Sequence, residues 1–172
     1  MMQELRHWDA LLFNENSIEL VRTFSSWGRG LMNFLLGMLL LALPLTYDEV
    51  FTTLDSFVRY VIIYSALIIL LFLLSRVFGS DMKLVKFWYT ISTLIFFAAV
   101  PLAILTYFCL FVLEALLDNV TVPNMIVSLV PYYLFLLMAF GSEQSARIPS
   151  EKKSIAFGVC SVVLVYTFMY FL

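Results

Sequence analysis

Five long runs without a charged residue limit what this chain can fold into more than any other feature of its sequence. A helix needs about 20 mainly apolar residues to cross a bilayer, and the runs are near that length. They are continuous rather than alternating, so a β-barrel is not expected. We predict an all-α fold, an integral membrane bundle of five transmembrane helices. The predicted spans are residues 30–47, 57–75, 87–113, 122–142 and 154–172, and the second extends the charge-free run 60–75 past Arg59.

The composition agrees with lipid as the solvent of the chain. Of its residues, 63% are hydrophobic and 13% are charged, whereas soluble domains have about half apolar and a quarter charged residues. We expect membrane lipids as partners and one compact membrane domain, residues 29–172. The net charge of −2 gives no reason to expect a nucleic-acid partner.

The basic residues predict how the helices are oriented. With five spans, nine of the ten Lys and Arg residues fall on one side, and Arg59 alone falls on the other. Basic loops stay in the cytoplasm, so we expect a cytoplasmic N-terminus and an outside C-terminus. The nine are Arg6, Arg22, Arg29, Arg76, Lys83, Lys86, Arg147, Lys152 and Lys153.

The first 28 residues differ from the rest because they carry charged residues and place their apolar residues at helical spacing. Leu5, Trp8 and Leu12 share one helix face, and Asn16 with Glu19 forms the pattern of a capping box. We predict short amphipathic helices lying on the membrane interface. Docking of this segment on a partner protein is the alternative.

The sequence contains no pattern for catalysis, a metal site or cofactor binding. The interiors of the predicted spans carry no ionisable residue, although ion transport and intramembrane chemistry usually need one. No zinc spacing, nucleophile elbow or phosphate loop is present. We therefore predict no catalytic, metal-binding or cofactor-binding residues, no cofactor and no enzymatic activity.

Helix packing gives the clearest candidate residues. Small residues spaced four apart let helices approach closely in lipid, and in-span prolines bend helices, whether around a bundle or along a pathway. Asn33 is the amide of the first span, and it either bonds to a neighbouring helix or touches a ligand. The predicted packing or partner-contact residues are Asn33, Gly37, Ser75, Gly79, Pro101, Pro131 and Gly158.

Parts of the chain resemble the Yip family of five-span membrane proteins. The resemblance rests on LSRVFG (74–79) before a basic loop, FWYT (87–90) leading to VPL (100–102), and SLVPYYLF (128–135). It implies five spans with a cytoplasmic N-terminus and no catalytic residues. Eukaryotic members bind Rab-type GTPases, but the short N-terminal region here is similar to prokaryotic members, to which that role does not carry over. We therefore expect a prokaryotic cytoplasmic (inner) membrane.

Two functions remain open from the sequence. The first is a non-enzymatic membrane scaffold or partner-binding subunit, which acts with a membrane-protein partner or as a homo-oligomer. The alternative is a small transporter, channel or lipid-handling protein. The alternative predicts a defined cavity. Its expected lining is Asn33, the hydroxyl side chains of the third span, or Tyr132 and Tyr133; the hydroxyl residues are Thr90, Ser92, Thr93 and Thr106.

Overall fold

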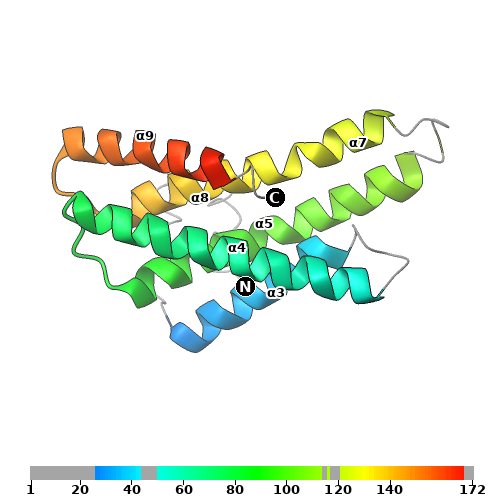
Figure 1. Cartoon of the computed structure of the whole chain (residues 1–172), viewed down its shortest axis with the longest axis horizontal. Coiled ribbons are helices and arrows are strands. Elements are labelled where there is room, and N and C mark those ends of the chain that lie inside the picture. Colours follow the sequence, from blue (N-terminus) through cyan, green and yellow to red (C-terminus); the bar gives the residue numbers. More distant parts are fainter. Residues whose placement is uncertain (1–25, 44–49, 114–115, 117–120, 169–172) are drawn as a thin grey trace, which may run out of the picture.

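The computed structural model describes residues 26–43, 50–113, 116 and 121–168, and within these ranges the chain is helical and has no strand. The prediction of an all-α fold is confirmed for this part of the chain. The elements in order are α3 (Trp27–Ala42), α4 (Val50–Val77), α5 (Leu84–Tyr107), the π-helical segment η3 (Phe108–Leu113), α7 (Thr121–Ser128), α8 (Val130–Ala146) and α9 (Glu151–Phe168) (Figure 1).

Three of the described helices are long and apolar enough to cross a membrane. They are Leu54–Val77, Leu84–Leu113 and Met125–Ala146, of which the second joins α5 to η3 and the third joins α7 to α8. α3 is apolar but shorter, and α9 starts with three charged residues, Glu151, Lys152 and Lys153.

The predicted boundaries differ from the helix ends because helical hydrogen bonding does not stop where an apolar run stops. α4 begins at Val50 and includes Asp55 and Arg59, and α8 continues through Glu143 to Ala146. Residues 1–25, which make up most of the segment predicted to form interfacial helices, lie outside the described residues. Pro44 and residues 169–172 also lie outside them.

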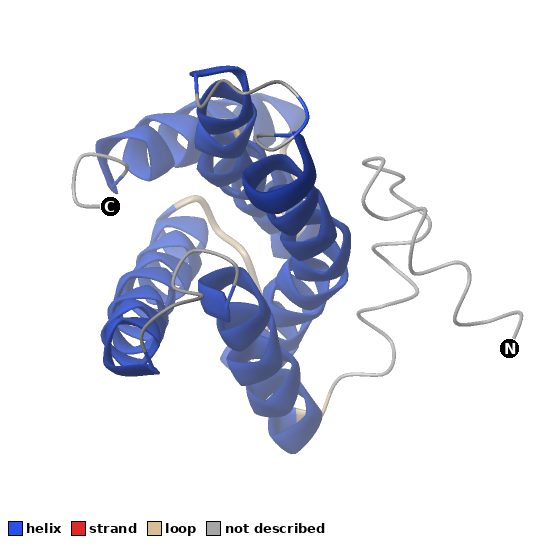
Figure 2. Cartoon of the chain, turned by 90° about the vertical axis from the view of Figure 1, so that its right-hand side faces the viewer, coloured by secondary structure: helices blue, strands red, loops and turns tan. Residues whose placement is uncertain are grey.

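α5 is the central helix of the bundle. Every residue from Phe87 to Ile95 is buried, so this half of α5 is covered on all sides. α3 packs along α5 on one side and α8 on another, while α4 contacts α3, α8 and α9. Figure 2 shows the packed helices from one end of the bundle.

The start of α5, the ends of α4 and α8, and the start of α9 lie at the same end of the bundle (Figure 1). We call it the basic end because its helix ends and loops carry Arg76, Lys83, Lys86, Arg147, Lys152 and Lys153. The α4–α5 connection is fixed by a turn at Gly79, which has a φ of 92°. The Gly79 amide donates to the Arg76 carbonyl and the Ser80 amide to the Ser75 carbonyl, the bonds of a Schellman helix end.

Candidate functional site

A cavity of about 250 Å³ lies among α4, α5, α7, α8 and the end of α3, in the half of the bundle away from the basic end. It reaches from exposed Ser128 to Tyr64 and Leu134, which are each only 2% exposed. This volume is larger than that of an apolar cavity of about 150 Å³ that binds benzene. Its lining residues are Leu41, Tyr60, Tyr64, Ala103, Thr106, Val127, Ser128, Val130, Pro131 and Leu134.

One wall of the cavity is an interruption between α7 and α8. The Leu129 amide donates to the Ile126 carbonyl over a three-residue turn, and α8 resumes at Val130. Pro131 has no N–H, so the Val127 carbonyl lacks its usual helical donor. Val127, Ser128, Val130 and Pro131 line the cavity at this interruption.

The opposite wall comes from α5, just before its hydrogen bonding changes to the π-helical pattern of η3. Ala103 and Thr106 line the cavity on this side, within the last two turns of α5 and after Pro101. Single-turn π-helical segments are rare and often occur at functional sites. The α5 residues that line the cavity belong to the regular α-helix, and the π-helical segment begins just beyond them at Phe108.

α4 contributes two tyrosines spaced four residues apart, so both lie on one helix face. The ring centroids of Tyr60 and Tyr64 are 6.1 Å apart, edge to face, and Tyr64 stacks on Phe135 of α8 at 5.5 Å. These contacts hold Tyr64 in one orientation at the inner wall of the cavity.

The lining chemistry is apolar with a few hydroxyl groups. No Asp, Glu, Lys, Arg or His is among the lining residues. Within the described ranges, no group of His, Cys, Asp or Glu side chains is placed to hold a metal ion. The cavity suits a hydrocarbon chain or a small apolar molecule that hydrogen-bonds to a hydroxyl group.

Sequence reasoning missed Tyr60 and Tyr64, although their spacing within an apolar run was a usable signal. Thr106 was among the hydroxyl residues expected to line a cavity and does so. The other residues expected there are not among the lining residues, namely Asn33, Thr90, Ser92, Thr93, Tyr132 and Tyr133.

The predicted packing residues Asn33 and Gly37 both lie where α3 meets α5. The Asn33 side-chain amide donates to the Thr93 hydroxyl over 3.1 Å. A Cβ atom at Gly37 would lie 3.2 Å from the Phe96 Cα atom. Gly30, which we did not predict, is equally close to α5, with the Tyr89 Cα at 3.2 Å from a Cβ.

Gly79 makes no close helix contact, whereas Ser75 is buried near the end of α4. The Ser75 hydroxyl donates to the Phe72 carbonyl of its own helix at 2.7 Å. A Cβ atom at Gly79 would meet nothing within 4 Å. Gly79 instead lies in the turn that ends α4, where the left-handed backbone conformation favours glycine.

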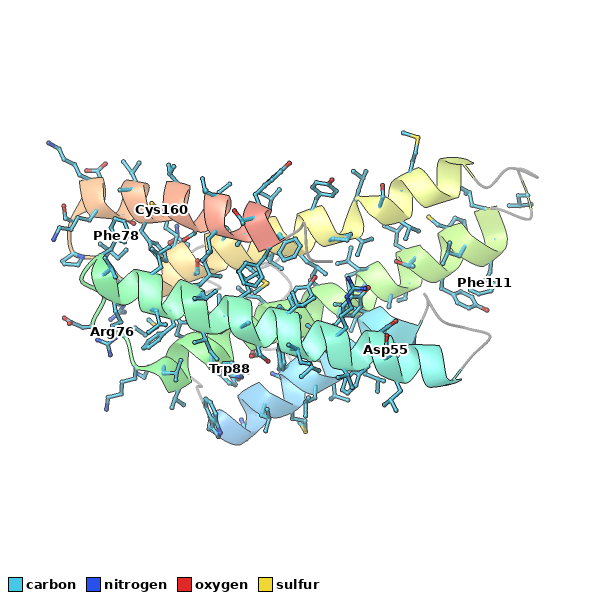
Figure 3. All side chains as sticks on the ribbon, viewed as in Figure 1. Asp55, Arg76, Phe78, Trp88, Phe111 and Cys160 are labelled. Atoms are coloured by element: carbon cyan, nitrogen blue, oxygen red, sulfur yellow. The ribbon has the colours of Figure 1, made fainter. Side chains whose placement is uncertain are left out.

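The remaining predicted residues have separate locations. Pro101 is exposed within α5, and Pro131 borders the cavity. Gly158 faces α8, where the Glu143 carboxyl carbon would lie 3.5 Å from a Cβ, and Ser154 donates to Glu143 over 3.2 Å. Figure 3 shows the side chains over the whole bundle.

Comparisons with known proteins give no relative for this chain. No model of a known protein family matches it, and no curated protein or solved structure matches it at a significant level.

Proposed function

We propose that the chain is a five-span membrane protein without enzymatic activity, with its basic end at the cytoplasmic face. Three described helices have membrane length, and the nine-to-one division of basic residues supports five spans with an outside C-terminus. The resemblance to short Yip-type proteins points in the same direction. The expected location is a prokaryotic cytoplasmic (inner) membrane.

Cysteine labelling tests this topology. In a background lacking Cys109 and Cys160, we would introduce Asp81→Cys at the basic end and Leu116→Cys at the other end. Asp81 is exposed and Leu116 is 74% exposed, so both sites suit a membrane-impermeant maleimide. Labelling from opposite sides of the membrane is expected. Labelling from the same side would contradict the proposed arrangement.

Within this topology, we propose that the protein handles lipid by holding a hydrocarbon chain in the cavity that Tyr64, Thr106 and Pro131 line. The observation that carries the proposal is the apolar cavity at the helix break beside Pro131. The hydroxyls of Tyr64 and Thr106 offer hydrogen bonds to an ester or hydroxyl group near the chain. The lack of charged lining residues argues against ion or proton coupling.

Photocrosslinking tests whether a chain enters the cavity. The full chain would be placed in nanodiscs with a phosphatidylethanolamine that carries a diazirine in one acyl chain, and adducts would be mapped by mass spectrometry. Tyr64 and Leu134 are 2% exposed, so a lipid in the surrounding bilayer cannot reach them. We expect adducts at these two residues.

Two variants on adjacent positions supply the control. Ala103→Leu adds volume inside the cavity and is expected to remove the adducts at Tyr64 and Leu134. Ile104→Phe adds bulk to the same helix turn, but Ile104 is 66% exposed and outside the lining, so the adducts should persist. Adducts confined to exposed residues in the wild-type protein would refute the proposal.

A scaffold or partner-binding role is the second candidate, and the placement of α9 favours it. This helix lies at the edge of the bundle and buries only Phe157, Ser161 and Val165. Its other faces expose compact side chains, including Val159 and Cys160. Such a surface suits contact with another helix in lipid.

Cys160 gives a direct test because Cys109 is buried and Cys160 is exposed. A thiol-to-thiol crosslinker applied to native membranes should produce a defined homodimer or a single partner adduct. Cys160→Ser should abolish it, whereas Cys109→Ser should not. A monomer alone, in membranes where Cys160 reacts with a monofunctional maleimide, would exclude this face as an interface.

A further inference from the structure

A second hollow, of about 300 Å³, lies at the basic end of the bundle, on the side opposite to the lipid-chain cavity. Its lining comes from the α4–α5 connection with the first turn of α5, and from the start of the α8–α9 connection, which is far away in the chain. The lining residues are Asp81, Met82, Lys83, Lys86 and Arg147. Three cationic groups and one carboxylate give this hollow a net positive charge.

The two loops are tied together beneath the hollow. The Ser80 hydroxyl donates to the Ala146 carbonyl at the end of α8, and it accepts a hydrogen bond from the Met82 amide over 3.3 Å. Both Ser80 and Met82 are buried. The Arg76 guanidinium also donates to the Ser80 carbonyl, at 3.0 Å. These bonds hold the loops in place before any ligand arrives, which lowers the entropy lost on binding.

The backbone around the hollow adds to its preference for anions. Lys83 is the N-cap of α5, yet its side chain makes no capping bond, and the first turn of α5 has no acidic residue. The first amides and the helix dipole at that point therefore retain their preference for negative charge. Arg147 ends α8 in the left-handed conformation, with a φ of 47°. Membrane orientation requires basic loops, but it does not require that Arg147 share a hollow with Lys83 and Lys86.

The surroundings indicate an anion that is attached to a hydrocarbon chain. The hollow lies where the apolar helices α4, α5 and α8 end, which is the level of lipid headgroups in a bilayer. Val77, Leu84 and Val85, at the adjoining ends of α4 and α5, expose apolar side chains. We propose that this hollow binds the phosphate of an acidic phospholipid. Basic hollows between transmembrane helices are known to bind anionic headgroups.

Native mass spectrometry on the full chain tests the site. The probes are phosphatidylglycerol, phosphatidylcholine with the same acyl chains, and inorganic phosphate, each titrated into the protein in a mild detergent. We expect phosphatidylglycerol to be retained in preference to phosphatidylcholine. Each basic residue near a charged lipid contributes about 1 kcal/mol, so each Lys→Gln change should weaken retention about fivefold.

A charge-matched variant separates the hollow from a general effect of charge. Changing Lys83, Lys86 and Arg147 to Gln should weaken phosphatidylglycerol retention about a hundredfold. The control changes three cations that do not line the hollow to Gln. These are Lys152 and Lys153 of the basic end and Arg29 in the first turn of α3. Retention by the control should stay within a few-fold of wild type.

Three results would overturn the proposal. They are equal losses in the two triple variants, no preference between the two lipids, and competition by inorganic phosphate at the lipid's own concentration. The last would assign the site to free phosphate. If the triple variant does not fold, the pair Lys86→Gln and Lys86→Arg decides. A fivefold loss in the first and retention in the second are expected, and equal behaviour refutes the site. A chain held in the lipid-chain cavity would retain both lipids equally, so the headgroup preference and its loss in the variants report on the hollow.

Discussion

Replacement of Gly37 by alanine should loosen the contact between α3 and α5 on which the centre of the bundle depends. The new Cβ would lie 3.2 Å from the Phe96 Cα, 3.3 Å from the Ile95 Cγ2 and 3.4 Å from the Phe96 amide nitrogen. Two of these three atoms belong to backbone, which cannot rotate away as a side-chain end can. α3 must therefore move away from α5 by a few tenths of an ångström along its main contact.

The expected magnitude follows from this geometry and a matched control. Overpacking of a close-packed contact destabilises by about 1–3 kcal/mol. Gly158→Ala makes the same chemical change inside another helix, but its nearest contact, the Glu143 carboxyl carbon at 3.5 Å, is an ordinary one. Any gain in helix propensity is shared by both variants. Gly37→Ala should therefore be about 1–3 kcal/mol less stable than Gly158→Ala.

Unfolding of the purified protein by SDS in mixed micelles measures this difference. The ring of Trp88 lies 5.7 Å from that of Trp27 and 5.3 Å from that of Phe34, so tryptophan fluorescence reports on the α3–α5 contact itself. Trp8 is outside the described residues, and a Trp8→Phe background removes its signal. Circular dichroism on the same samples should give the same transition midpoint.

The reasoning fails if Gly37→Ala is as stable as Gly158→Ala in both signals. That result would mean that α3 can shift without loss, so the close approach of α3 and α5 would not be a constraint on the fold. A second position tests the same contact between α3 and α5 independently. Gly30→Ala places its Cβ 3.2 Å from the Tyr89 Cα and should be destabilised to a similar degree.

Three further changes are predicted, each measured by the same SDS unfolding. A double-mutant cycle of Asn33→Leu and Thr93→Val should give a coupling of about 0.6 kcal/mol, and additive losses would mean that their hydrogen bond contributes nothing. Gly79→Ala should lose about 1–2 kcal/mol because of its positive φ, whereas Gly79→Asn should lose less. Ser80→Ala should lose about 1–3 kcal/mol because the Ala146 carbonyl is left unpaired and buried, and an unchanged midpoint would show that water replaces the hydroxyl.

The helical class of the fold could be predicted from the sequence because lipid demands it. A backbone without water must satisfy its own hydrogen bonds, so long apolar runs imply helices. The helix ends were harder to predict because a charged residue ends an apolar run without ending the helix. Glu143 illustrates this, since it lies inside α8 and accepts a hydrogen bond from Ser154 of α9.

The contacts between helices were less accessible to sequence reasoning. Spacing alone suggested that Ser75 and Gly79 pack against a neighbour, but Gly79 is in the turn that ends α4. Spacing also gave no reason to select Gly141, where a Cβ would approach the Leu94 Cδ1 atom to 2.5 Å. Which face of a helix meets protein depends on partners that are distant in the chain, and one sequence in a uniformly apolar solvent does not reveal them.

The two halves of the bundle differ in how regularly their helices pack, and one substitution can distinguish a binding cavity from a packing defect. Towards the basic end, glycines bring α3 against the regular part of α5, and a Schellman turn ends α4. In the other half, the π-helical segment, the break before Pro131 and the cavity occur together. If the cavity is only a defect, Ala103→Leu should fill it and raise the SDS midpoint without changing the lipid that copurifies. If the cavity holds a chain, the same change should displace that chain, so retention falls and the gain in stability is lost with it.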